Sequence, residues 1–110
     1  MSGWITPGRQ LVLVECYVSG PGEDTVHATA DRIAGACNAL TSSGTTVDYL
    51  GALFVAADEA AFHLFAAGDV DAVVEASRQA GLRVERVVQA VSVGGEVQGA
   101  IGHPSRQLCP

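Results

Sequence analysis

Apolar and polar residues follow two periods along the chain. Some stretches are continuously apolar or alternate with a period of two, as strands do, and others repeat apolar residues every three or four positions, as helices do. Segments rich in glycine, serine or proline separate these stretches and are typical of loops. The pattern predicts the order strand, helix, strand, strand, helix, strand, over residues 9–18, 23–40, 45–55, 61–66, 69–80 and 82–93.

Local signals refine the ends of these elements. Asp69 is expected to cap the second helix, and Gly81 to end it in a left-handed conformation. Residues 56–59 can turn the chain tightly, so the second and third strands are predicted to form a hairpin. The alternation slips between Val84 and Val87, which predicts a β-bulge or a strand end at this point. The inner stripe of the second helix is expected to contain Val70, Val73, Val74, Ser77 and Ala80.

This order of elements predicts an α+β domain of the ferredoxin-like type, a βαββαβ sandwich. Each helix has one apolar stripe and therefore needs a sheet face to cover it. Right-handed crossovers place both helices on one face of a four-stranded antiparallel sheet, with the first and third strands in the middle. The domain is expected to span residues 9–93, and residues 94–110 to form a C-terminal arm or a disordered tail.

The sheet face opposite the helices is predicted to be apolar. With Phe62 and Leu64 assigned to the helix side, the residues expected on this outer face from the first and third strands are Leu11, Leu13, Glu15, Tyr17, His63 and Phe65. An exposed apolar face of this size is typical of an interface. We therefore expect a homodimer, or a higher oligomer, that packs through its sheets, with a binding site in a cavity between the two sheets.

Glu15 and His63 are the polar groups of greatest chemical interest on this outer face. A carboxylate in apolar surroundings must be paired or have a raised pKa, and such a group can serve as a general base. Together with His63 it could bind a metal ion or move a proton; the structural alternative is a pair with Arg86 on the neighbouring strand. The expected ligand-binding residues are Glu15, Tyr17, His63, Phe65 and Arg86, and the expected metal ligands are His63 and Glu15.

Charge and cysteine content limit the kinds of partner and the cellular compartment that are expected. The 110 residues include 12 acidic and 6 basic residues, for a formal net charge of −6. Because phosphate backbones and anionic membranes attract basic surfaces, neither nucleic acid nor a membrane is an expected partner. The three cysteines form no CxxC pair, and Cys16 and Cys37 are expected to be buried free thiols. With no signal-peptide pattern at the start, these features predict a cytoplasmic protein.

Two segments resemble a bacterial family of short, uncharacterised ferredoxin-like proteins. Residues 13–16 are similar to the family's first strand, and residues 76–87 are similar to its second helix, the glycine that ends it and its last strand. The resemblance covers residues 10–93 and implies the ferredoxin-like fold and a dimer. The family includes a nickel-binding member, so the resemblance suggests a divalent metal such as nickel as cofactor. Residues 17–20, after the first strand, contain no histidine, and no metal ligand is transferred from the family.

Three functions are compatible with these features. The first is a small cytoplasmic dimer that binds a ligand or a metal ion near the sheet face. The alternative is a cofactor-free enzyme, similar to a monooxygenase or an isomerase, that acts on a small apolar substrate; it rests on analogy with other dimers of this fold. The third is an interaction module with a solid interface and no cavity.

Overall fold

The computed structural model of the chain describes residues 9–19 and 22–94. Its elements are β1 (Gln10–Tyr17), α1 (Gly22–Ser42), β2 (Val47–Val55), the short 3-10 helix η1 (Ala56–Asp58), β3 (Ala60–Ala67), α2 (Val70–Gln79) and β4 (Val84–Ala90). The predicted order of strands and helices is confirmed. Most of the segment predicted as a C-terminal arm or tail, residues 95–110, lies outside the described residues.

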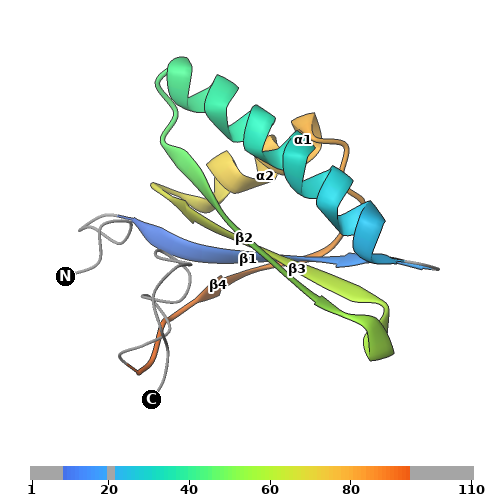
Figure 1. Cartoon of the computed structure of the whole chain (residues 1–110). Coiled ribbons are helices and arrows are strands. Elements are labelled where there is room, and N and C mark those ends of the chain that lie inside the picture. Colours follow the sequence, from blue (N-terminus) through green and yellow to red (C-terminus); the bar gives the residue numbers. More distant parts are fainter. Residues whose placement is uncertain (1–8, 20–21, 95–110) are drawn as a thin grey trace.

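The four strands form one antiparallel sheet in the order β2-β3-β1-β4. Figure 1 shows α1 and α2 on the same side of this sheet and neither helix on the other side. The predicted α+β architecture is confirmed, with the first and third strands in the centre. The arrangement is consistent with a ferredoxin-like fold.

The local signals in the sequence act as expected. The Asp69 side chain accepts a hydrogen bond from the backbone N–H of Ala72 at 2.9 Å, which caps α2. Gly81 follows α2 with a φ of 76°, a left-handed conformation that favours glycine. In the β1–β4 pairing the register shifts between Glu15 and Cys16, so the predicted bulge in the last strand is confirmed.

The inner face of α2 differs from the prediction at three positions. Val74 is 47 % exposed, so it does not belong to the inner stripe. Ala72 and Ala76 are buried instead, together with Val73 and Ser77. The reason is geometric: successive residues of a helix are about 100° apart, so Val74 turns away from the sheet when Val73 faces it.

The main core lies between the helices and the sheet. Val12 and Val14 of β1, Phe65 of β3, Ile33 of α1 and Val73 of α2 are all fully buried in one cluster. Cys16 and Cys37 belong to the same cluster as free thiols, as predicted. Neither helix of the described residues is both long and apolar enough to cross a membrane.

The orientation predicted for β3 is wrong. His63 lies opposite Val14, and Phe65 lies opposite Val12, in the β1–β3 register. Both are buried, at 1 % and 0 % exposure, and both face the helices. Phe62 therefore points to the open face of the sheet, because side chains alternate along a strand. Every residue from 60 to 67 except His63 is apolar, so the sequence of β3 itself does not show which alternate set faces inward.

The open face, the sheet surface opposite the helices, is apolar at its centre. Alternation from the registers places there Leu11, Leu13, Leu50, Leu53, Val55, Phe62, Leu64 and Val88. Leu53 remains 60 % exposed. Ion pairs lie toward the two ends of β1: Arg9 with Asp48 at 2.8 Å, and Arg86 with Glu15 at 3.1 Å. The prediction of an apolar outer face is confirmed, although β3 contributes a different set of side chains.

Two glycines of α1 provide a matched test of the packing. A Cβ on Gly22 would lie 2.9 Å from Val18 Cγ1 and closer still to the Phe54 ring, whereas a Cβ on Gly35 would meet no atom within 4 Å. Gly22→Ala is expected to lower the free energy of unfolding by about 1–3 kcal/mol through overpacking. Gly35→Ala is expected to raise it by about 0.5–1 kcal/mol, because alanine restricts the unfolded chain and favours the helix. Urea unfolding of both variants measures the difference, and equal effects would contradict the packing described here.

Candidate functional site

Three of the predicted site residues lie near one end of the open face. Arg86 donates to Glu15 Oε1 at 3.1 Å. Glu15 therefore forms the pair with Arg86 that the sequence offered as the alternative to a pair with His63. The hydroxyl of Tyr17 donates to Glu59 Oε1 at 2.9 Å, and this bond raises the pKa of the tyrosine. The polar groups of these residues are thus engaged with one another or with a neighbouring turn.

The predicted pair of Glu15 and His63 is not formed. Glu15 is on the open face, whereas His63 is on the face covered by the helices, so the two side chains point to opposite sides of the sheet. They cannot share one metal ion. Within residues 9–19 and 22–94, no group of three or more histidine, cysteine, aspartate or glutamate side chains could hold a metal. Nickel binding stays a prediction from the resemblance, without a matching set of ligands in this part of the chain.

His63 instead forms a hydrogen bond with Tyr49 of the neighbouring strand β2. The Tyr49 hydroxyl and His63 Nδ1 are 2.9 Å apart. The Tyr49 ring also packs against Phe65, with ring centroids 5.5 Å apart. Phe65, which was expected to bind ligand, is a fully buried core residue that supports this pair.

A small cavity opens beside the His63 ring, and we call it the His63 cavity. Its volume is about 180 Å³. The sheet contributes Cys16 and His63, and residues 81–83, between α2 and β4, form another side. The N-terminal half of α1 contributes one helical face, with Thr25, Val26, Thr29 and Arg32. The cavity is therefore built on the helix side of the sheet, away from the open face.

One nitrogen of His63 is available to this cavity. Nδ1 is bonded to Tyr49, and Nε2 has no hydrogen-bond partner among the described residues. The Tyr49 hydroxyl has no other partner in this part of the chain, so we assign its hydrogen to the bond with Nδ1. Nε2 then carries the ring hydrogen. His63 thus presents an N–H donor from a side chain that is only 1 % exposed.

Burial keeps the titratable groups of this region uncharged at neutral pH. Desolvation lowers the pKa of His63 to about 4. Desolvation also raises the pKa of Tyr49 to about 12. The pKa of Cys16 is raised to about 11 by desolvation and, secondarily, by the charges of Glu85 and Glu15. Cys16 is therefore a neutral thiol and not an activated nucleophile.

A second cavity lies on the Tyr49 side of the hydrogen-bonded pair, between α1 and β2. Its volume is about 400 Å³, and Tyr49, Phe54 and Ala52 line it together with Glu23 and His27 of α1. Val26 lines both cavities, so the two lie on either side of this residue of α1. The Tyr49–His63 hydrogen bond therefore connects the linings of two cavities beneath the helix.

The charged residues of the His63 cavity are both arginines. Arg32 Nε donates to the backbone oxygen of Ala80 at 2.9 Å, which fixes the guanidinium at the end of α2. Arg83 is exposed in the loop before β4. In the described part of the chain, neither arginine forms an ion pair. Two guanidinium groups without carboxylate partners among the described residues therefore line the same small cavity.

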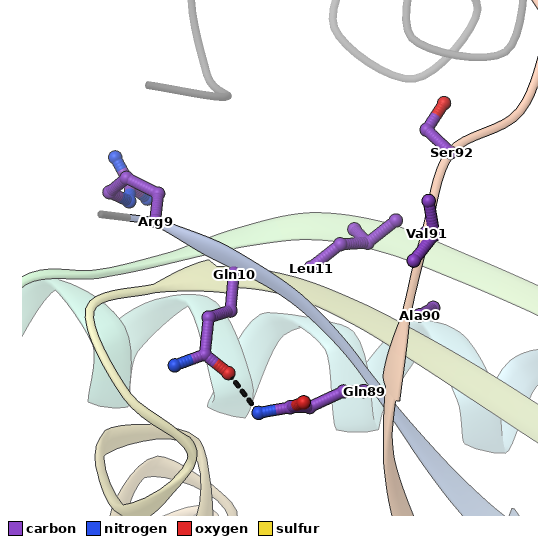
Figure 2. Close-up of a pocket in the computed structure, with 7 residues that line it drawn as sticks. All are labelled: Arg9, Gln10, Leu11, Gln89, Ala90, Val91 and Ser92. Carbon is purple, nitrogen blue, oxygen red and sulfur yellow. Dashed lines mark hydrogen bonds between the residues drawn. The ribbon is translucent and has the colours of Figure 1, made fainter. Parts of the chain in front are cut away.

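A larger cavity lies at the start of β1, but Arg9, Gln10 and Gln89 in its lining already form hydrogen bonds with protein groups. Its volume is about 450 Å³, and it extends from Arg9 along β1 to Ser92 after β4. Figure 2 shows the side chains of Gln10 and Gln89 pointing toward each other, joined by a hydrogen bond. Arg9 is already engaged with Asp48 and with the backbone oxygen of Ala66 at 2.7 Å. We therefore take the His63 cavity as the candidate site.

Two of the predicted ligand-binding residues, Tyr17 and His63, line the His63 cavity. Sequence reasoning placed His63 on the wrong face, and it missed both arginines. Arg32 lies within α1, next to its apolar residue Ile33, and Arg83 lies two residues after Gly81, the glycine that ends α2. They are 51 positions apart by number, and only the packing of α1 against the end of α2 brings them together. The sequence offered only an indirect signal, because Arg32 and Arg83 are two of only 6 basic residues in a chain with a net charge of −6.

Comparisons of the chain with protein-family models, with curated proteins and with solved structures found no match.

Proposed function

We propose that this protein is a homodimer that binds a small molecule in the His63 cavity of each copy. The observation that supports this proposal is the buried His63 ring, whose Nε2 faces the cavity without a protein partner. Nε2 is not among the fully buried polar atoms that lack a partner, so it is accessible from the cavity, and a ligand acceptor would supply its hydrogen bond. Small-molecule sites are typically apolar hollows with a few such polar groups.

The dimer is proposed to form through the open face. Four strands about 4.8 Å apart, each about eight residues long at about 3.3 Å per residue, present roughly 500 Å² in plan. Two such faces bury roughly 1,000 Å², which is near the lower bound for a specific interface. The charged groups at the ends are already paired within one chain, so a second copy would cover an apolar centre and no isolated charge. A two-fold axis makes such a face self-complementary.

The proposal includes the ferredoxin-like fold. In this fold, dimerisation and ligand binding would use opposite sides of the sheet. The interface uses one side of the sheet, and the His63 cavity lies on the other. A dimer therefore keeps two accessible sites. This arrangement replaces the site between two sheets that the sequence suggested, because the polar groups that would have lined it are divided between the faces.

A cofactor-free enzyme is the second candidate, and the Tyr49–His63 hydrogen bond favours it. The bond joins a hydroxyl and an imidazole beside two cavities, which is an arrangement able to move a proton. Proton transfer next to the carbonyl of an apolar substrate would be an isomerase-type reaction. With a pKa of about 4, His63 is a weak base at neutral pH, so binding is the better supported function.

Histidine-ring NMR of the full-length dimer in D₂O tests the proposal. Benzoate, benzamide and cyclohexanone are added to the protein, and the ring C–H resonances of His63, assigned with His63→Gln, are followed. We expect at least one compound to shift the His63 resonances in a saturable way. His27, which lines the second cavity, reports whether a compound binds there instead, so a shift of His63 without a shift of His27 indicates binding in the His63 cavity. Exchange of cyclohexanone α-protons for deuterium, faster with the protein than with Tyr49→Phe, would indicate the enzyme.

Two variants of α1 show whether the compounds enter the cavity. Thr29→Phe fills the cavity from its helix wall and is expected to abolish the shifts. Asn38→Phe adds the same ring at an exposed position of α1 outside the cavity lining and is expected to leave them unchanged. Shifts that survive in Thr29→Phe, or an unresponsive His63 with every compound, would refute binding in the cavity.

A further inference from the structure

The hydrogen-bonding groups of the His63 cavity are mainly donors. Arg32 and Arg83 bring guanidinium groups, and a guanidinium has five N–H donors and no acceptor. His63 adds Nε2–H, since Nδ1 is taken by Tyr49. Thr29 has a hydroxyl that already accepts a long contact, 3.5 Å, from Arg32. Thr25 and Tyr17 add two further hydroxyls, and that of Tyr17 already donates to Glu59. Because the arginines and His63 Nε2 can only donate, a ligand that fits them must offer acceptors.

The charge of the lining points to an anion. None of the described residues that line the His63 cavity is an aspartate or a glutamate, although the chain has 12 acidic residues. A neighbouring cavity, which shares Cys16 and Tyr17 with the His63 cavity, has the opposite lining, with Glu15, Asp58, Glu59 and Glu85. Arg32 and Arg83 lack carboxylate partners within the described residues, so a ligand carboxylate would supply the acceptor that arginine pairs with most strongly.

The remaining lining is apolar and the space is limited. Val18, Val26 and Leu82 provide hydrocarbon walls. A volume of about 180 Å³ corresponds to about six water molecules at about 30 Å³ each. A ligand with one anionic group and one small ring or branched chain matches both the apolar walls and the size.

From these features we infer that the His63 cavity binds a small organic carboxylate. The carboxylate is recognised by the N–H groups of Arg32, Arg83 and His63, and its hydrocarbon part packs against the apolar walls. The inference rests on the proposed small-molecule function and adds the chemical class of the ligand. Arg32 is held by Ala80 at the end of α2, so it offers a fixed donor, whereas Arg83 lines the cavity from the exposed loop before β4.

Affinity for benzoate and for its neutral isostere benzamide tests the class of ligand. The dissociation constants are measured from the His63 shifts of the full-length dimer. Benzoate is expected to bind at least about tenfold more tightly than benzamide, since charge-assisted hydrogen bonds are the stronger ones. Arg83→Gln is expected to weaken benzoate about tenfold or more and to leave benzamide unchanged, and Arg83→Lys to recover part of the loss. Arg78→Gln, which removes an exposed arginine of α2 outside the cavity lining, is the matched control.

The outcomes separate this inference from the proposed function. If benzamide or cyclohexanone shifts His63 as strongly as benzoate does, the cavity binds small molecules and the anion preference is refuted. If inorganic phosphate displaces benzoate at equal concentration, recognition of an organic carboxylate is refuted as well. If none of the compounds shifts His63, the proposed function fails and this inference fails with it. Benzoate selectivity that depends on Arg83 supports both.

Discussion

Replacing Leu13 with arginine is expected to turn the proposed dimer into a monomer that is still folded. Leu13 lies at the centre of the open face, opposite Leu64 on β3 and Val88 on β4. Burying a leucine side chain contributes about 1.5–3 kcal/mol, and a two-fold interface contains it twice. The loss of about 3–6 kcal/mol raises the dissociation constant of the dimer by about 10²- to 10⁴-fold. Sedimentation equilibrium over a range of protein concentrations measures this change.

The control for Leu13→Arg is a valine that is exposed on a helix. Val74 of α2 is 47 % exposed on the other side of the sheet, so Val74→Arg adds the same charge away from the proposed interface. It is expected to keep the dissociation constant of the parent chain. Circular dichroism of both variants checks that they are folded. A parent chain that stays monomeric at millimolar concentration, or a Leu13→Arg dimer of unchanged strength, would contradict an interface on the open face.

Signals within a few residues predicted most of the fold. The cap at Asp69, the left-handed Gly81 and the slip before Val87 all depend on neighbouring residues, so the sequence contains them in full. The order of the elements then leaves few arrangements of two helices on one sheet. This is why the topology could be derived without a structure.

The facing of β3 could not be derived in the same way. A strand with one polar face shows its orientation through alternation, but apolar residues occupy both alternate sets of β3, apart from His63. The register with β1 decides the matter, since His63 is paired with Val14 and not with Leu13. A shift of one residue would have turned every side chain to the other face. The predicted Glu15–His63 pair failed for this reason.

The candidate site depends on contacts between distant parts of the chain. Tyr49 reaches His63 from the neighbouring strand β2, where it lies opposite Phe65, two positions from His63 on the same face. Arg32 and Arg83 meet because α1 crosses the end of α2. No short motif encodes either contact, so the sequence could supply the residue types but not their grouping.

The stability of the protein is expected to fall steeply between pH 6.5 and pH 4 because of His63. Its pKa is about 4 in the folded chain, against an ordinary value of 6.5. Between these values the unfolded chain binds more protons than the folded chain, so the free energy of unfolding decreases as the pH falls. The full contribution is present above pH 6.5 and lost below pH 4. A difference of this size corresponds to about 3 kcal/mol per chain.

Urea unfolding at a fixed protein concentration, at pH 7.5 and at pH 4, isolates this contribution. In His63→Gln the decrease in the free energy of unfolding between the two pH values is expected to be about 3 kcal/mol smaller than in the parent chain, because the glutamine does not titrate. His27→Gln removes an exposed histidine and is expected to keep the decrease of the parent chain. The other titratable groups are common to all three chains, so the comparison between variants cancels them. A His63→Gln variant that loses as much stability as the parent chain would show that the ring is protonated freely, and the assignment of a neutral Nε2–H donor to the cavity would then be wrong.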